Sequence, residues 1–285
     1  MVRTVGTTVR GIRAPIVKEG DNIIDIVVNS VLKASKYENF VIDDRDVIGI
    51  TESLVARSQG NYATVEDIAE DVNRKFDAEL GIVFPILSRN RFSIILKGIA
   101  LTGKKIHLLL NYPSDEVGNH LMDVDKMNEL GINPYNDVLT EKKYRNLFGE
   151  NVTHPFTGID YVKIYKELAV NNNIEIYLSS NPKTILNYTK DVLVANIHDR
   201  QRTKKILRQA GANKIYGLDD LLSKPINGSG YNSDYGLLGS NLASNTQVKL
   251  FPRNSKYYVD EIQRKIKEEI GKSVEVMVYG DGAFK

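Results

Sequence analysis

Two aspartates that follow predicted strands are the residues best suited to chemistry. Asp115 comes after the apolar run Ile106–Leu110, and Asp281 comes, between two glycines, after Val274–Val278. In α/β sheets, ligands gather outside the carboxyl ends of the strands. Two carboxylates brought together there could share a divalent cation, because such cations favour hard oxygen ligands. The spacing alone equally allows each aspartate to cap a turn, so both interpretations stay open.

The apolar pattern predicts the elements that must position these aspartates. Residues 2–12 are expected to form a strand, and Asp21 could cap a helix that buries Ile24, Val28 and their neighbours. The stretch "DVIGITESLVARSQG" reads as a buried strand that leaves into a polar turn. Thr64 is expected to cap the next helix. After "THPFTG", helices alternate with short apolar runs, which predicts a small parallel α/β unit.

The composition excludes several classes of function. Lys and Arg exceed Asp and Glu by only 38 − 36 = 2, so no strong field favours nucleic acid or an acidic membrane. The absence of cysteine excludes disulfides and thiolate metal sites. No apolar run approaches the about 20 residues that span a bilayer. We therefore expect a cytoplasmic protein with neither a nucleic-acid nor a membrane partner.

Common nucleotide and metal motifs are missing. The chain has no Gly-x-x-x-x-Gly-Lys-Ser/Thr loop, no Gly-x-Gly-x-x-Gly turn after a strand and no His-Glu-x-x-His pair. A nucleotide site in this chain must therefore be of an unusual kind.

Four stretches in a shared order resemble one family. They read "RAPIVKEGDNI", "DVIGITESLVARSQG", "KIHLLLNYPSDEVGN" and "YVDEIQRKIKEEIGKSVEVMVYGDGAFK". In this order they are similar to segments of the coenzyme F420-0:L-glutamate ligases, also called F420-0:gamma-glutamyl ligases. The resemblance covers roughly residues 1–120 and 235–285.

The resemblance implies a fold and an activity. The fold would be α/β, a mixed sheet core formed by 1–120 and 235–285, with a small parallel α/β subdomain inserted at 121–234. The activity would join L-glutamate to coenzyme F420-0 through an acyl phosphate, with GTP as co-substrate and Mn²⁺ or Mg²⁺ as cofactor. Metal would screen the repulsion between the acid and the triphosphate. A homodimer is also implied.

The resemblance also assigns residues. Asp115 and Asp281 match metal-binding aspartates, and Gly282 takes the place of a metal-contacting threonine. The residues that match nucleotide contacts are Arg13, Ala14, Pro15, Ile16, Glu52, Ser53, Arg57, and either Asn119 or Asn241. Arg57 replaces a lysine that approaches the phosphates, which exchanges a point charge for a fork.

Three departures from the family pattern leave alternatives open. Arg13 replaces a glycine, which affects how closely the backbone can approach the nucleotide. Asp234 could take the place of Asp115, since more than a hundred residues separate Asp115 from "LLGSN". The strand before Asp281 is central in the family and more chain follows it there, so we expect a part of a longer ligase-like protein. The alternatives to the expected activity are ligation of another acid and amine on this scaffold, or nucleotide or metabolite binding without catalysis.

Overall fold

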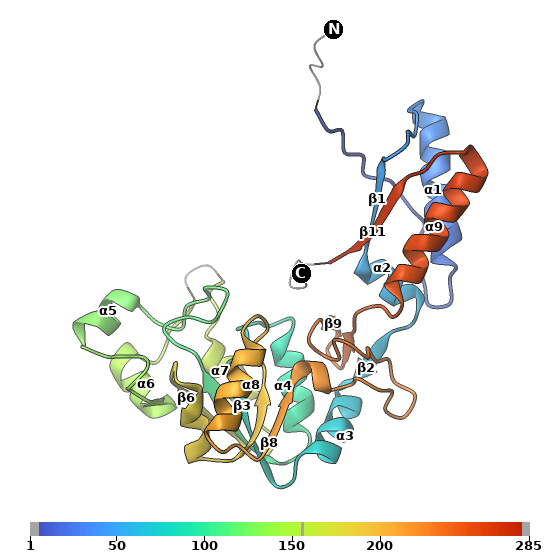
Figure 1. Cartoon of the computed structure of the whole chain (residues 1–285). Coiled ribbons are helices and arrows are strands. Elements are labelled where there is room, and N and C mark those ends of the chain that lie inside the picture. The colour runs from blue at the N-terminus through green and yellow to red at the C-terminus, as the bar shows by residue number, and fades with distance from the viewer. Residues whose placement is uncertain (1–5, 155–156, 281–285) are drawn as a thin grey trace. The chain divides into compact units, whose positions relative to one another are not determined.

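The computed structural model describes residues 6–154 and 157–280 and divides the chain into two compact units (Figure 1). The terminal unit comprises Met1–Gly60 with Pro252–Lys285, and the central unit comprises Asn61–Phe251. Helices and strands alternate in both units, so the expected mixed α/β class is confirmed. No helix in the described part of the chain is long and apolar enough to cross a membrane.

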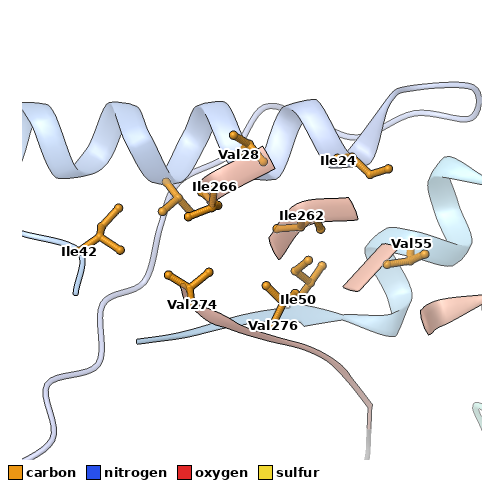
Figure 2. Packing of buried hydrophobic residues seen from close by; sticks show 10 residues of the cluster. Ile24, Val28, Ile42, Ile50, Val55, Ile262, Ile266, Val274 and Val276 are labelled. Atoms are coloured by element: carbon orange, nitrogen blue, oxygen red, sulfur yellow. The ribbon is translucent and has the colours of Figure 1, made fainter. Parts of the chain in front are cut away.

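The terminal unit is built on two parallel strands, β1 (Val47–Thr51) and β11 (Glu275–Tyr279). Helices α1 (Ile23–Glu38) and α9 (Ser255–Ile270) pack beside this pair, and α2 (Glu52–Ser58) follows β1 directly. The buried residues of its core are Ile24, Val28, Val31, Ile42, Ile50, Val55, Ile262, Ile266, Val274 and Val276 (Figure 2). Segments from both ends of the chain therefore share one core.

Local signals explain the limits of α1. Asn22, rather than the expected Asp21, is the N-cap, because its side chain accepts a hydrogen bond from the amide of Asp25. Asn39 ends the helix in the left-handed region with φ of 51°. The strand expected over 2–12 is not found in residues 6–12, and residues 1–5 lie outside the described part of the chain.

A six-stranded sheet forms the centre of the central unit. Its order is β5-β6-β4-β3-β7-β8, and only the pairing of β5 with β6 is antiparallel. The strands are β3 (Glu79–Val83), β4 (Lys105–Leu110), β5 (Leu139–Thr140), β6 (Ile174–Leu178), β7 (Asp191–Val194) and β8 (Lys214–Gly217). Strands β4, β5 and β6 lie on one side of β3, with the later β6 between β4 and the edge strand β5, and the chain then adds β7 and β8 on the other side.

Helices and a second, small sheet surround this one. The helices are α3 (Val65–Lys75), α4 (Phe92–Ala100), α5 (Val124–Glu129), α6 (Glu141–Phe148), α7 (Tyr161–Glu167) and α8 (Arg200–Gln209), with 3₁₀ turns η1 (Pro182–Asn187) and η2 (Leu218–Asp220). The small sheet joins β2 (Tyr62–Thr64), β10 (Gln247–Lys249) and β9 (Asn241–Ser244). Thr64 caps α3 as expected, with a reciprocal capping box to Asp67.

The boundaries of the compact units differ from the expected division at residues 121 and 234. Strands β3 and β4 lie in the same sheet as β6, β7 and β8, and they do not pair with β1 or β11. The parallel α/β unit therefore begins near Asn61 instead of residue 121. The physical reason is strand pairing: Gly81 of β3 pairs with Val192 of β7, so residues before the expected boundary are integral to the sheet.

Candidate functional site

The carboxyl ends of β1 and β11 bring the predicted residue Glu52 close to Gly280, which precedes the predicted Asp281 in the sequence. Glu52 begins α2 immediately after β1, and Gly280 immediately follows β11. A Cβ atom on Gly280 would lie 3.0 Å from Cδ of Glu52, so the two residues are in close contact. Asp281 and Gly282, the predicted metal residues, lie outside the described residues.

The other predicted residues of this unit lie on α2 and before α1. Ser53 is half-buried in the first turn of α2, and Arg57 is exposed in its last turn. In the described part of the chain, no carboxylate lies within 4.0 Å of the Arg57 guanidinium. Its charge is therefore available to an anionic ligand.

The segment 13–16 is largely exposed. Arg13 and Pro15 line a groove of about 1100 Å³ between this segment and one side of α1. Ala14 and Ile16 are exposed as well, and 81% of the Ile16 surface is accessible. The structure therefore places two of these four residues on one concave surface.

Asp115 lies in the central unit and is 94% buried, with 6% of its surface accessible. Its Oδ2 accepts hydrogen bonds from the amide of Leu87 at 2.8 Å and from Nδ2 of Asn119 at 2.7 Å. Its Oδ1 accepts from the amides of Val117 at 3.0 Å and Asn119 at 2.8 Å. A carboxylate has about four lone-pair positions, and these four donors use them all. In this arrangement Asp115 does not fit as a metal ligand.

Glu116 was not indicated by the sequence, yet it continues the same contacts. Its carboxylate accepts hydrogen bonds from the amides of Ile197 and His198, the latter at 3.1 Å. Asp115 thus holds the loop after β3, and Glu116 holds the loop after β7, while both side chains come from the loop after β4. The adjacent acids in "SDEVGN" were the only available signal, because their partners are backbone amides far away in the sequence.

Of the remaining candidates of the central unit, Asn119 belongs to this cluster of contacts, whereas Asn241 and Asp234 make other contacts. Asn119 bonds to Asp115, whereas Asn241 begins β9, where its Oδ1 accepts from the amide of Leu242 at 2.9 Å. Asp234 is exposed, and its Oδ1 accepts only a long hydrogen bond of 3.4 Å from Ser233 among the contacts described. No group of three or more His, Asp or Glu side chains suited to a metal occurs among residues 6–154 and 157–280.

Comparison with known proteins gives one positive result. The family described as F420-0:Gamma-glutamyl ligase matches residues 11–285, nearly the whole chain. No curated protein and no solved structure matches. The match includes the central unit as well as both segments of the terminal unit. The chain therefore belongs to the F420-0:gamma-glutamyl ligase family.

Proposed function

We propose that the protein is a GTP-dependent ligase that forms a gamma-glutamyl amide through an acyl phosphate. The observation that carries this proposal is the family match over residues 11–285, which includes every residue predicted to contact nucleotide. The close contact of Glu52 with Gly280 supports it, because it joins two matching segments at one edge of the β1–β11 pair.

The reaction has two steps. A carboxylate oxygen of the acid substrate attacks the γ-phosphorus of GTP, and GDP leaves. The uncharged amine of L-glutamate then attacks the carbonyl carbon, phosphate leaves, and the amine nitrogen loses a proton. Arg57 is exposed without a carboxylate partner in the described part of the chain, and it would bind the transferring phosphate. A divalent cation, Mn²⁺ or Mg²⁺, would supply charge neutralisation at the phosphates, and Asp281 is its proposed ligand.

Product analysis tests the proposal. The protein is incubated with GTP, Mg²⁺ or Mn²⁺, L-glutamate and coenzyme F420-0, and products are identified by mass spectrometry alongside GDP release. We expect a metal-dependent glutamyl adduct, and a loss of about 100-fold in kcat/KM in Arg57→Ala, as is typical when a charge on a transferring phosphate is removed. Arg57→Lys should retain part of the activity, and Lys36→Gln, an exposed change on α1, should retain all of it.

The same experiment separates the alternatives. GDP release without a glutamyl adduct would direct the search to another acid and amine pair. If neither GDP nor an adduct forms with any metal, the ligase proposal is contradicted. Binding of a nucleotide or metabolite without catalysis would then be the remaining alternative.

A further inference from the structure

Helix α8 and the turn η1 form a surface of the central unit on which positive charge is concentrated. Both pack on one side of the six-stranded sheet, because Ile185 of η1 and Leu207 of α8 are buried with Val192 and Val194, which share one side of β7. Segment 182–209, which the structure describes throughout, has one exposed acid, Asp199, and five exposed cations. These cations, here called the basic surface, are Lys183, Lys190, Arg202, Lys205 and Arg208.

Two further cations of α8 are neutralised within the protein. Nε of Arg200 lies 3.1 Å from Oδ2 of Asp219, and Nζ of Lys204 lies 2.8 Å from Oδ2 of Asp220. Both aspartates belong to η2, so these ion pairs join the helix to the rest of the unit. The charges of Arg200 and Lys204 are therefore accounted for by the fold.

The exposed cations of α8 lack such partners. Arg202, Lys205 and Arg208 recur every three residues, so they form one stripe with a rise of about 4.5 Å between neighbours. The Arg202 guanidinium lies 3.9 Å from the exposed carboxylate of Asp199. In the described part of the chain, the other four cations of the basic surface have no carboxylate within 4.0 Å. The stripe therefore presents its charge to the solvent.

The basic surface lacks the usual features of a site for single-stranded nucleic acid. Such sites stack bases on available aromatic rings. Tyr188 is the one Phe, Tyr or Trp of segment 182–209, and its ring is already stacked on that of Tyr177, with the centroids 3.9 Å apart. The net charge of +2 also gives no long-range attraction to a polyanion. Complementarity at short range therefore favours a partner with regularly spaced carboxylates.

We propose that the basic surface docks an acidic segment of a partner protein. Asp or Glu side chains at intervals of three or four residues lie on one side of a helix and rise by about 4.5–6 Å, which matches the spacing of the stripe. Lys183 and Lys190 add positive charge on η1 and just before β7. This docking goes beyond the ligase reaction and does not depend on it.

Fluorescence anisotropy of labelled probes with the whole protein tests this proposal. The probes are a helical peptide with Glu at every third or fourth position, the same peptide with Gln in place of Glu, and a single-stranded DNA with the net charge of the Glu peptide. We expect saturable binding of the Glu peptide in roughly 0.01 M salt and weaker binding in roughly 0.15 M salt, because salt screens exposed charges. The Gln peptide should not bind.

Charge reversal locates the binding. Lys205→Glu replaces an attraction by a repulsion and should weaken the Glu peptide about tenfold. Lys183→Glu should weaken it as well, because Lys183 extends the same surface on η1. The matched control is Lys142→Glu, which changes the net charge equally at an exposed position of α6, beside β5 and β6. This control should bind like the unchanged protein, and all three variants should keep its melting temperature.

Four outcomes would overturn the proposal. They are no saturable binding of the Glu peptide, equal weakening by Lys205→Glu and Lys142→Glu, tighter binding of the DNA than of the Glu peptide, and a self-association of the protein that Lys205→Glu abolishes. The third would make the partner a nucleic acid, and the fourth would make it a second copy of the chain. The assay contains no nucleotide, metal or glutamate, so a failure of ligation in the product assay would leave its result intact.

Discussion

At the scale of single residues, Asp115 shows how one buried carboxylate can hold two loops of the fold together. A buried carboxylate is costly unless its lone pairs are satisfied, and four N–H groups satisfy those of Asp115. Its partner Leu87 lies 28 positions earlier in the sequence, so the carboxylate fixes two loops at once. Its position after a strand, the feature that suggested a metal ligand, is also what allows it to join these loops.

Asp115→Asn should therefore destabilise the protein. An asparagine replaces one acceptor oxygen by an NH₂ group, which leaves two donors unpaired and should lower the free energy of unfolding by about 2–4 kcal/mol. Urea denaturation without metal measures the change. Asp234→Asn is the matched control and should change the stability by less than about 0.5 kcal/mol, because Asp234 is exposed. An Asp115→Asn variant as stable as the unchanged protein would contradict the structural role and return Asp115 to the metal candidates.

His107 is a second residue whose role is set by burial. It lies in β4 with 3% of its surface accessible, stacks at 5.4 Å on Tyr188, and neither ring nitrogen has a hydrogen-bond partner among the described residues. Burial lowers the pKa of His107 below its ordinary 6.5, and the charge of Lys105 adds to this. The nearby carboxylates of Glu79 and Glu175, at 3.6 Å and 3.7 Å, oppose the shift without reversing it.

The lowered pKa of His107 predicts a loss of stability in mild acid. Below pH 6.5 the imidazole of His107 binds a proton more readily in the unfolded chain than in the folded protein. The stability that the neutral His107 contributes is therefore present above this pH and is lost as the pH decreases. His107→Phe keeps a planar ring and removes the titration. Its melting temperature should fall less than that of the unchanged protein between about pH 7.5 and about pH 5. The lowered pKa of Glu175 acts below its ordinary 4.5, outside this interval, and parallel curves for the two proteins would exclude His107 as the cause.

At the scale of elements, the close approach of η1 to the sheet depends on Gly81. A Cβ atom at this position of β3 would lie 2.4 Å from Cγ1 of Ile185 in η1 and 3.1 Å from Cγ2 of Thr189. Ile185 is fully buried together with Val83, Val192 and Leu207 of α8. A glycine in a central strand normally weakens it, so here the loss is offset by the packing of η1.

A double-mutant cycle tests this packing. Gly81→Ala should destabilise the protein by about 1–3 kcal/mol through overpacking, and Ile185→Ala by about 2–5 kcal/mol through the cavity it leaves. Adding Gly81→Ala to Ile185→Ala should cost much less than it does alone, because the clashing atoms are gone. If the losses of unfolding free energy in the two single variants simply add up in the double variant, the contact with Ile185 is not what excludes a larger side chain at position 81.

The sequence predicts elements well where the signal is local. Thr64 and Asp67 lie three positions apart, and their reciprocal hydrogen bonds form as the pattern indicates. The start of α1 was displaced by one residue, because Asp21 and Asn22 both suit a cap and only backbone geometry selects Asn22. The pairing of strands, in contrast, has no such local signal. Nothing local shows that Gly81 pairs with Val192, so the limits of the central unit could not be derived from the sequence.

The contacts of the candidate site could likewise be predicted only in part. The sequence indicated Glu52 as a nucleotide contact but not its contact with the end of β11, which depends on the parallel pairing of β1 with β11. The contacts of Glu116 with Ile197 and His198 join loops about eighty positions apart through backbone amides, which carry no residue-type signal.

At the scale of the whole molecule, the ends of the central unit meet at Asn61. This residue is fully buried, its Nδ2 donates to the carbonyl of Phe251 at 2.6 Å, and its own carbonyl accepts from the amide of Leu250 at 3.0 Å. Both ends of the unit are thus fixed side by side. A unit whose ends adjoin can be joined into another chain with little entropic cost.

The excised segment 61–251 should therefore fold alone. We expect cooperative thermal unfolding and a dispersed amide NMR spectrum, because this segment contains the complete six-stranded sheet and its surrounding helices. Asn61→Ala in this fragment should lower its stability by about 1–3 kcal/mol through unpaired buried groups. A fragment with helical circular dichroism but no fixed tertiary signal would contradict the independence of this unit.

The pairing of β1 with β11 also sets an order of events on the ribosome. Val47 pairs with Glu275, 228 positions later (275 − 47), so β1 is synthesised long before its partner exists. At 5–20 residues per second, this interval lasts roughly 10–45 s. The central unit can fold within it, whereas Ile24, Val28 and Ile50 must wait for Ile262, Ile266 and Val276. The nascent amino-terminal segment is thus an apolar surface without its partners for most of translation, and a chaperone that binds such segments would meet it first.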